Sequence, residues 1–139
     1  MEPARITTHE EMMFFDTDCG GVVHNLAYLR HIETARTRLA AELGWNLREM
    51  SEAQCFPVVV RTEIDYRLPA RLADHLRIDG WLEEVSRVRF WCAFKVHREE
   101  DNALLVTCRQ QLAIITLPDG TAERLDPALA ERCCGAPGS

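Results

Sequence analysis

The residues between positions 25 and 43 have the periodicity of an amphipathic helix. Apolar side chains recur there at steps of three or four, which places them on one face of a helix. Asn25 is a residue type that often caps the start of a helix, and Gly44 suits the left-handed position that ends many helices. The pattern predicts a long helix over residues 25–43 and a shorter one over 47–53. The apolar stripe of the long helix consists of Leu26, Leu29, Ile32, Ala35, Leu39 and Leu43.

Beyond residue 56 the pattern changes to the two-residue alternation of β-strands. Strands are predicted over residues 58–68, 76–83, 88–96 and 104–117, and the last one ends at a Pro-Asp-Gly turn, residues 118–120. A first strand is predicted at 5–15, before a glycine-containing turn over 16–21, and a short helical turn at 127–132. In the 58–68 strand, one predicted face carries Val58, Val60, Thr62, Ile64, Tyr66 and Leu68.

The order of these elements predicts an α+β fold. One strand comes first, then the long helix, then four strands that alternate as antiparallel neighbours do. A sheet with one apolar face needs an element to cover that face, and the long helix is the candidate. We therefore expect a five-stranded antiparallel sheet wrapped around one central helix. Trp81, Trp91 and Ile115 fall on the opposite face of the sheet, which indicates a partner subunit.

The chain is predicted to form one domain over residues 1–139. No repeat, low-complexity block or linker divides the 139 residues, and domains commonly have this length. The last residues, about 133–139, are rich in glycine, proline and serine, and we expect a mobile tail. A net charge of −6 argues against a general nucleic-acid binder, which needs a basic face. No apolar run approaches the roughly 18 residues of a membrane span.

The cysteines indicate neither a metal site nor a disulfide framework. They form no CxxC pair and no zinc-type alternation with histidine. The N-terminal residues are polar, with no apolar run behind them, so no signal peptide is predicted. Reduced thiols without an export signal point to a cytoplasmic protein. The six cysteines are Cys19, Cys55, Cys92, Cys108, Cys133 and Cys134.

Residues 14–44 carry two aspartates, then paired glycines and paired valines, directly before the predicted helix. This stretch, FFDTDCGGVVHNLAYLRHIETARTRLAAELG, resembles the opening of the 4-hydroxybenzoyl-CoA thioesterase family. Within it, the chain is most similar to the branch of small bacterial acyl-CoA thioesterases associated with the Tol-Pal system. The likeness continues through residues 66–70, Asp74 and the turn at 118–120. The resemblance implies the hotdog fold, hydrolysis of acyl-CoA thioesters, and a dimer as the smallest working unit, so we expect a homodimer or homotetramer.

One departure from that branch lies at the start of the helix. The branch usually has Tyr-His-x-Asn-Tyr after the paired valines, whereas this chain has His24-Asn25-Leu26-Ala27-Tyr28. The histidine therefore comes one position early, and alanine replaces the usual asparagine. The family's catalytic aspartate is matched by Asp18, so the departure bears on the substrate range more than on the reaction.

Asp18 is the expected catalytic residue. An ordinary aspartate is ionised at pH 7, so Asp18 can attack a thioester directly or take a proton from water. The N–H groups of the first helical turn, from about His24 to Leu26, have no partners within the helix and lie at its positive end. They are suited to stabilising an oxyanion. We therefore expect His24 and Asn25 to stabilise the oxyanion or orient the substrate, and we expect no cofactor.

Other interpretations of the turn stay open. Asp18 is also explained as a turn or capping residue, and His24 as a hydrogen-bonded histidine in a half-buried turn. Asp16 is best explained as a structural residue that braces the turn by hydrogen bonds. A metal site formed by Asp16, Asp18 and His24 is not expected. Cys19 is an alternative nucleophile, although it lacks an obvious histidine base.

Three further charged residues are candidates for the site. Glu33 is a possible catalytic carboxylate on the helix, although pairing with Arg30 or Arg36 explains it more simply. Arg87 and Arg89 form the best basic cluster for the phosphates of coenzyme A, with solvated surface arginines as the alternative. Two other functions remain open: a non-catalytic module that binds acyl-CoA or acyl carriers, and a thioesterase for carrier-protein-bound acyl chains.

Overall fold

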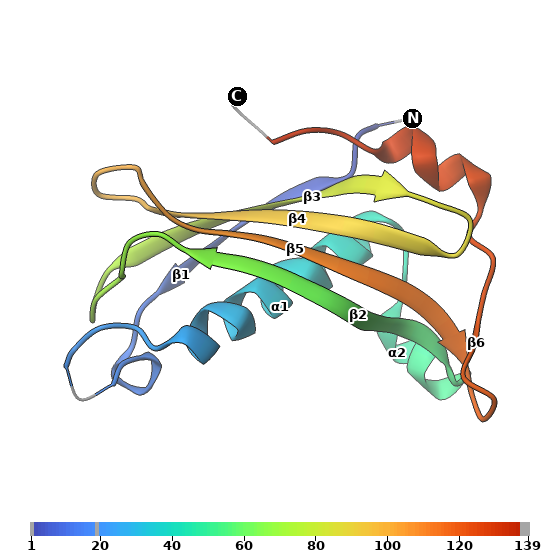
Figure 1. Ribbon diagram of the computed structural model, residues 1–139, viewed down its shortest axis with the longest axis horizontal. Helices are drawn as coiled ribbons and strands as arrows, with labels where there is room; N and C mark the ends of the chain where they lie inside the picture. The colour runs from blue at the N-terminus through green and yellow to red at the C-terminus, as the bar shows by residue number, and fades with distance from the viewer. Residues whose placement is uncertain (1, 19, 137–139) are drawn as a thin grey trace.

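The computed structural model describes residues 2–18 and 20–136, and its main element is a curled antiparallel sheet (Figure 1). Its strands follow the order β1-β3-β4-β5-β2, and β6 pairs with β5. The predicted five strands are present, and the sixth is a two-residue addition after the turn at 118–120. The strands are β1 (Arg5–Glu11), β2 (Cys55–Tyr66), β3 (His75–Val85), β4 (Arg89–Arg98), β5 (Ala103–Thr116) and β6 (Thr121–Ala122).

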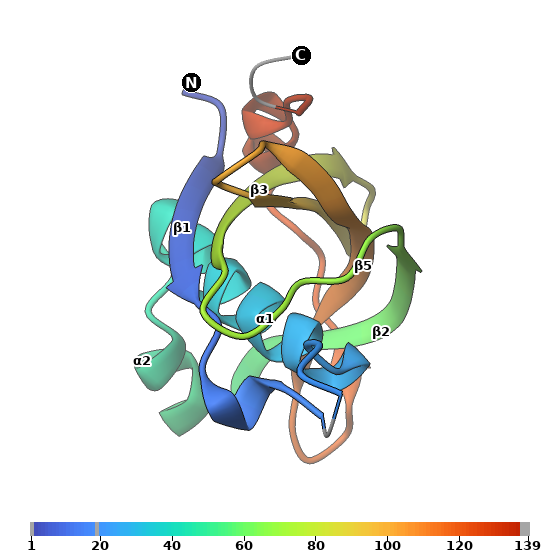
Figure 2. The ribbon, with the colours of Figure 1, turned by 90° about the vertical axis from the view of Figure 1, so that its left-hand side faces the viewer.

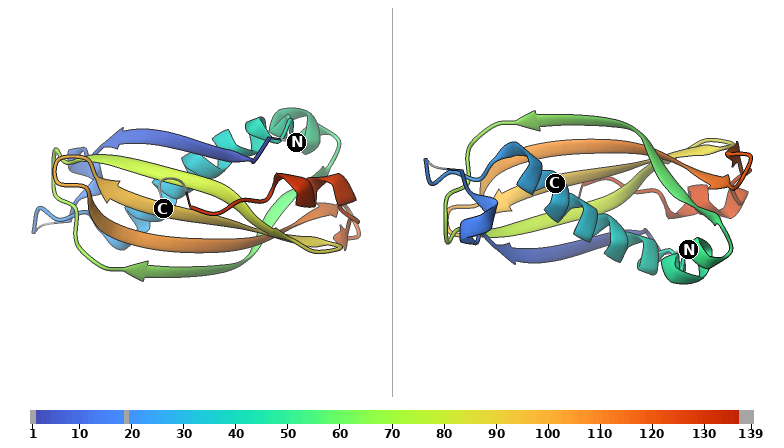
Figure 3. Two further views of the ribbon diagram at one scale, coloured as in Figure 1. Left: turned by 90° about the horizontal axis from the view of Figure 1, so that it is seen from above. Right: turned by 90° about the horizontal axis from the view of Figure 1, so that it is seen from below.

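The helix α1 (Asn25–Glu42) lies in the hollow of this sheet. Figure 2 shows the sheet curling around α1, and Figure 3 shows α1 running across the sheet face. The shorter α2 (Leu47–Glu52) follows, and the helical turn at Pro127–Arg132 is a 3-10 helix. This arrangement is the hotdog fold that the sequence resemblance implied. No helix in the described residues combines the length and apolar character needed to cross a membrane.

The ends of α1 differ slightly from the prediction. The N-cap is His24 rather than Asn25, because the backbone of His24 is still extended (φ −80°, ψ 158°) and its N–H donates to the Asp16 carbonyl at 3.0 Å. Asn25 is therefore the first helical residue. At the other end Gly44 has φ +82°, a left-handed conformation that glycine adopts without strain. This confirms the predicted role of Gly44.

The buried face of α1 is rotated from the predicted stripe at its N-terminal end. Leu26 is 71% exposed, whereas Tyr28 and His31 are buried. From Ile32 onward the prediction is correct, because Ile32, Ala35 and Leu39 pack into the core with the inner faces of the strands. The error arises because a polar network replaces apolar packing under the first turns of α1. Apolar periodicity cannot reveal such a network.

The strand β1 ends four residues earlier than predicted. The chain leaves the sheet after Glu11, and a 3-10 helix occupies Phe14–Asp16. Asp16 folds this segment back, because its carboxylate Oδ2 accepts the Met13 N–H at 2.9 Å. The aromatic pair Phe14 and Phe15 is consequently exposed rather than part of a strand.

The strand β2 contains one extra residue that inverts part of the predicted face. Val59 pairs with Leu112 and Arg61 pairs with Gln111, so Val60 has no partner of its own. Leu112 belongs to the core, and cross-strand partners share a face, so Val59 faces α1 and Val58 does not. Beyond the irregularity, Thr62, Ile64 and Tyr66 share one face as predicted, and that face is toward α1.

The outer face of the sheet is better covered than the sequence indicated. Trp81 is only 5% exposed in the single chain, so the expectation of an exposed tryptophan there is wrong. The ring of Trp91 lies 4.1 Å from the guanidinium of Arg109, which also bonds Glu83 at 2.7 Å and Glu63 at 3.0 Å. Since side chains of the same chain shield these rings, they give little reason to expect a partner subunit on this face.

The C-terminal segment is bound to the start of the chain. The Ala4 N–H donates to the Arg132 carbonyl at 2.8 Å, and the Cys134 N–H donates to the Leu82 carbonyl at 2.9 Å. The predicted tail over 133–139 is therefore attached to the sheet at its first two residues. Residues 137–139 lie outside the described part of the chain.

Candidate active site

Asp18 lies in a tight antiparallel loop directly before α1. Thr17 and Val23 form a β-bridge across the loop, and the Asp18 N–H donates to the Val22 carbonyl at 2.9 Å. Gly21 closes the loop with φ +77°, and its N–H donates to the Asp18 carbonyl at 3.1 Å. A glycine is needed there because other residues are strained at that φ. The loop therefore holds the backbone of Asp18 at a fixed place.

The Asp18 side chain is exposed at the mouth of this loop. Its Oδ1 accepts the Gly20 N–H at 2.8 Å. In the described residues, Oδ2 has no hydrogen-bond partner. One carboxylate oxygen is thus used to orient the group, and the other is available to a substrate or a water molecule.

A cleft of about 600 Å³ lies beside this carboxylate, and it brings together three of the five residues predicted for the site. Asp18, His24 and Asn25 all line it. The opposite wall is formed by residues 66–69, at the end of β2. The cleft therefore lies between the loop, the start of α1 and the last residues of the edge strand.

Two tyrosines anchor the walls of the cleft. The Tyr28 hydroxyl accepts the Ala70 N–H at 2.8 Å, and the Tyr66 hydroxyl donates to the Asn25 carbonyl at 3.3 Å. Burial raises the pKa of both phenols, so they remain neutral at physiological pH. Their rings are 5.8 Å apart. They connect the start of α1 to the end of β2 without adding charge.

The backbone donors of the cleft are fewer than predicted. The His24 N–H is already bonded to the Asp16 carbonyl at 3.0 Å, so it is not free to stabilise an oxyanion. The N–H groups of Asn25 and Leu26 belong to the first turn of α1 and have no acceptor within residues 2–18 and 20–136. The candidate oxyanion donors are therefore Asn25 and Leu26, and His24 contributes only its imidazole.

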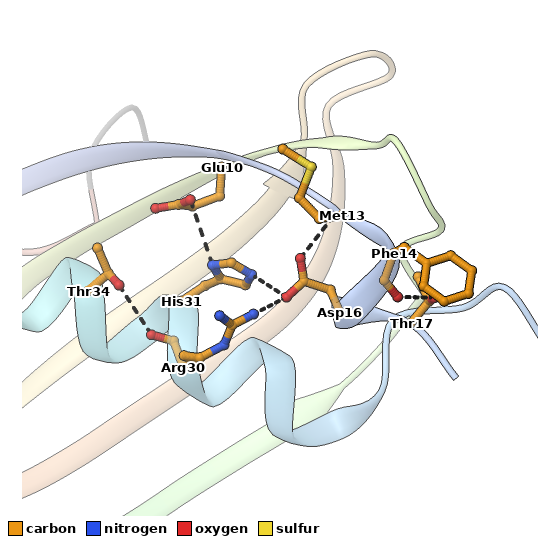
Figure 4. A network of polar contacts seen from close by, with 8 residues as sticks. All are labelled: Glu10, Met13, Phe14, Asp16, Thr17, Arg30, His31 and Thr34. Atoms are coloured by element: carbon orange, nitrogen blue, oxygen red, sulfur yellow. Dashed lines mark hydrogen bonds and ion pairs between the residues drawn. The ribbon is translucent and has the colours of Figure 1, made fainter. Parts of the chain in front are cut away.

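Asp16, two residues away, has a different environment (Figure 4). It is 1% exposed, and its carboxylate receives the Met13 N–H, the Arg30 guanidinium and the His31 ring Nε2, the last at 3.1 Å. These bonds tie the end of the loop to the first turns of α1. They confirm the prediction that Asp16 braces the turn.

His31 is the residue of this region that the sequence interpretation missed. Its Nε2 contacts Asp16, and its Nδ1 lies 3.8 Å from Glu10 on β1. The signal was available: residue 31 lies one position before Ile32 on the buried face of the helix. A buried histidine needs polar partners, and the loop before the helix offers two aspartates, of which the buried Asp16 is the partner.

The remaining candidates do not line the Asp18 cleft. Arg87 lies in the turn between β3 and β4, and Arg89 is the first residue of β4. The neighbouring Phe90 contacts Trp45, just after the C-terminal end of α1, at 5.4 Å between ring centroids. Asp18 lies before the other end of α1, and an 18-residue helix is about 27 Å long. Within one chain, therefore, the arginines and Asp18 are far apart.

Glu33 does not line the Asp18 cleft, and Cys19 lies outside the described residues. Glu33 is on an exposed part of α1, 3.8 Å from Arg36, and borders a different cavity. No cluster of three or more histidine, cysteine, aspartate or glutamate side chains is placed to bind a metal ion in the part of the chain that is described.

Comparison with known proteins gives consistent matches. An acyl-CoA thioesterase, YbgC from Haemophilus influenzae, is 39% identical over 72 residues, which are 51% of this chain and 53% of that protein. The matched region thus spans about half the length of this curated relative. The structure of a probable thioesterase from Bartonella henselae is 26% identical, with a TM-score of 0.80 over 88% of this chain and 100% of its own.

A 1,4-dihydroxy-2-naphthoyl-CoA thioesterase from Synechocystis shares the fold. It has a TM-score of 0.83 at 23% identity, over 94% of this chain and 96% of its own. The family model of the thioesterase-like superfamily matches residues 13–133, which include the Asp18 loop, α1 and the whole sheet except β1. These matches confirm the resemblance drawn from residues 14–44, and the chain belongs to the thioesterase-like superfamily.

Proposed function

We propose that the protein hydrolyses acyl-CoA thioesters to a free acid and coenzyme A, with Asp18 as its catalytic carboxylate. The observation that carries the proposal is the shared cleft: an exposed carboxylate and two backbone donors without acceptors line one cavity. Thioester hydrolysis requires this pair of groups, because one activates the attacking oxygen and the other stabilises the charge that develops on the carbonyl oxygen.

In the general-base route, Asp18 accepts a proton from a water molecule as the water oxygen attacks the thioester carbonyl carbon. The carbonyl oxygen becomes an oxyanion, which the Asn25 and Leu26 N–H groups stabilise. The carbon–sulfur bond then breaks, and the coenzyme A thiolate takes a proton. The His24 imidazole, on the same cleft wall, orients the water or the substrate.

In the nucleophilic route, an Asp18 oxygen attacks the carbonyl carbon itself. Breaking the carbon–sulfur bond leaves a mixed anhydride on Asp18, which water then hydrolyses to the free acid and the original carboxylate. The donors act on the same oxyanion in both routes. Hydrolysis of an acyl-CoA in ¹⁸O-water under single-turnover conditions identifies this route when ¹⁸O appears in the protein, because only attack of water on the side-chain carboxyl carbon of Asp18 in the anhydride places it there.

The proposed activity is tested by measuring free thiol released from a panel of acyl-CoA and aryl-CoA thioesters. The proposal is supported if the wild-type protein hydrolyses at least one thioester of the panel much faster than the Asp18→Asn variant does. Tight binding without thiol release identifies the non-catalytic binding module instead. Activity on thioesters of an acyl carrier protein, with none on coenzyme A esters, identifies a carrier-protein thioesterase.

The proposal includes a homodimer or homotetramer. The exposed apolar side chains Leu26 and Leu68 line the cleft, and the exposed Phe14 and Phe15 lie in the 3-10 helix before the Asp18 loop. In addition, Arg87 and Arg89 are distant from Asp18 in one chain, so coenzyme A phosphates contact them at this site only if a second subunit supplies them. We expect light scattering at micromolar concentration to give at least twice 15.9 kDa; a stable monomer is incompatible with this part of the proposal.

The proposed compartment is the cytoplasm. All five cysteines in the described residues are free thiols, which fits a reducing environment, where disulfides are rare. Fractionation of the native cells, followed by detection of the protein, tests this assignment.

A further inference from the structure

A second cavity lies beside the C-terminal half of α1, and no residue that lines it lines the Asp18 cleft. Its volume is about 250 Å³, and it is enclosed by α1, α2, the start of β2 and the inner faces of β4 and β5. Large apolar side chains form one part of its wall, including Leu39, Trp45, Phe56, Phe90 and Leu112, and polar side chains such as Thr37 and Ser51 form the rest. At about 30 Å³ for a group the size of water, the cavity holds on the order of eight non-hydrogen atoms.

Two charged residues of α1 line this cavity, the exposed Glu33 and the partly buried Arg36. The Arg36 side chain is 22% exposed, and its Nη1 donates to the Gln110 side-chain oxygen at 2.5 Å. Gln110 is itself 5% exposed, and its amide nitrogen donates to Thr62 at 3.3 Å. The second bond fixes the Gln110 oxygen toward Arg36. The guanidinium is therefore held in place by a neutral amide.

The positive charge of Arg36 is poorly balanced by the protein. The nearest carboxylate is Glu33, 3.8 Å away, which is beyond hydrogen-bonding distance, and its side chain is 67% exposed to water. Among the described residues, Gln110 supplies the one acceptor within hydrogen-bonding distance of the guanidinium. Burial accordingly lowers the pKa of Arg36 below its ordinary value. A partly buried guanidinium whose ion-pair partner is an exposed carboxylate at 3.8 Å keeps donors available for a second anion.

We infer that this cavity binds an aliphatic carboxylate with on the order of eight non-hydrogen atoms in all, with the carboxylate on the Arg36 guanidinium. A guanidinium presents parallel N–H donors that match the two oxygens of a carboxylate, and one such donor is already used by Gln110. The apolar walls contact the rest of the ligand. Glu33, at the rim, is exposed enough for water to screen its repulsion of an anion.

Two sources supply this ligand chemistry. One is an acyl group that ends in a carboxylate on the substrate itself, which rests on the proposed thioesterase function. The other is a free carboxylic acid, the class of compound that hydrolysis of a thioester releases. The binding site does not depend on which of the two occupies it, so it is tested first.

The binding test is calorimetric titration with octanoate and with octanamide, its neutral counterpart. We expect octanoate to bind the wild-type protein at least tenfold more tightly than octanamide. Arg36→Met keeps most of the aliphatic stem and removes the charge, so octanoate affinity should fall at least tenfold while octanamide affinity stays within about twofold. Arg38→Met is the matched control, because Arg38 is an exposed arginine on the same helix, and it should leave both affinities unchanged.

Equal binding of octanoate to wild type and Arg36→Met, or no binding of octanoate to wild type, overturns the inference. Arg36→Met should fold, since it removes a charge that the protein balances poorly, and circular dichroism checks this. If it does not fold, Arg36→Lys serves instead. Lysine keeps the positive charge but lacks the parallel N–H donors of the guanidinium. An undiminished octanoate affinity in that variant therefore also overturns the inference.

The source is identified by comparing octanoyl-CoA with its ω-carboxy counterpart, suberoyl-CoA. If the ligand is the substrate's own carboxylate, Arg36→Met lowers kcat/KM for suberoyl-CoA at least tenfold and leaves that for octanoyl-CoA within about twofold. If the ligand is a free acid, Arg36→Met changes kcat/KM for both esters by the same factor. Added octanoate then changes the rate of hydrolysis of both esters in the wild-type protein and not in Arg36→Met. If the protein hydrolyses no thioester, the proposed function is wrong. The octanoate titration still tests whether the cavity binds a carboxylate.

Discussion

Asp16 and Asp18 are two residues apart in one loop, but their surroundings are opposite. Asp16 is buried and accepts bonds from the backbone, from Arg30 and from His31, so its charge is fully used within the protein. Asp18 is exposed and has one acceptor oxygen free beside a cleft. The comparison shows that the same residue type provides a rigid support in one place and a reactive group in the other. The support fixes the loop that presents the reactive group.

The largest effect is expected for Asp18→Asn. Asparagine has nearly the same shape and still accepts the Gly20 N–H, but it lacks the charge and the basic oxygen. We expect kcat to fall at least about a hundredfold, with KM changed much less and the free energy of unfolding changed by no more than about 0.5 kcal/mol. Steady-state kinetics and urea unfolding measure the two quantities. Near-parental activity in the folded variant means that the assigned site is wrong, and Glu33 becomes the next carboxylate to test.

The converse change, Asp16→Asn, should act on stability. The substitution leaves Arg30 and buried His31 facing a neutral amide, and bonds to charged groups contribute about 1.5–3 kcal/mol each. We expect the free energy of unfolding to fall by about 2–3 kcal/mol, and kcat of the folded fraction to fall less than in Asp18→Asn. If Asp16→Asn is as stable as the parent but as inactive as Asp18→Asn, the roles of the two aspartates are not separate.

A smaller effect is expected for Gly21→Ala. An added methyl group meets no atom within 4 Å, so the cost arises from the positive φ alone. That cost is about 1 kcal/mol, measured as the free energy of unfolding. Gly135→Ala is the control, because a methyl group there also meets nothing and the backbone is not left-handed. A similar loss of stability in both variants contradicts this explanation of the loop.

The smallest effect is expected for Cys19→Ala. If Asp18 supplies the catalytic oxygen, removing the neighbouring thiol should keep kcat within about tenfold, or about 1.4 kcal/mol of transition-state stabilisation. Treatment with a thiol alkylator should have a similarly small effect on the rate. Complete loss of hydrolysis in both experiments identifies Cys19 as the nucleophile and removes the distinction between Asp16 and Asp18.

The fold was predictable from the sequence because its main elements follow local patterns. The period of residues 32–43 and the glycine at 44 identify α1, and the two-residue alternation identifies the strands. The first turns of α1 were not predictable in the same way. There His31 and Asp16 replace apolar packing, and a buried polar network depends on contacts between segments that are distant in sequence.

The candidate site was predictable only in part. The loop sequence and its family resemblance indicate Asp18, His24 and Asn25, and all three line one cleft. Local pattern did not reveal that the His24 N–H is used by the Asp16 carbonyl. It also did not reveal the second cavity, because Arg36, Gln110 and Thr62 come from three separate elements. Their proximity results from the packing of α1 against β2 and β5.

The extra residue at Val60 has a consequence for assembly. The strand β2 is at the edge of the sheet, so its outer backbone groups are open to pairing with another chain. A strand that adds to this edge meets two stretches, residues 55–59 and 61–66. Odd-numbered side chains face α1 in the first stretch, and even-numbered side chains face α1 in the second. A straight incoming strand matches one stretch or the other, so the edge offers a short, defined docking length rather than its full length.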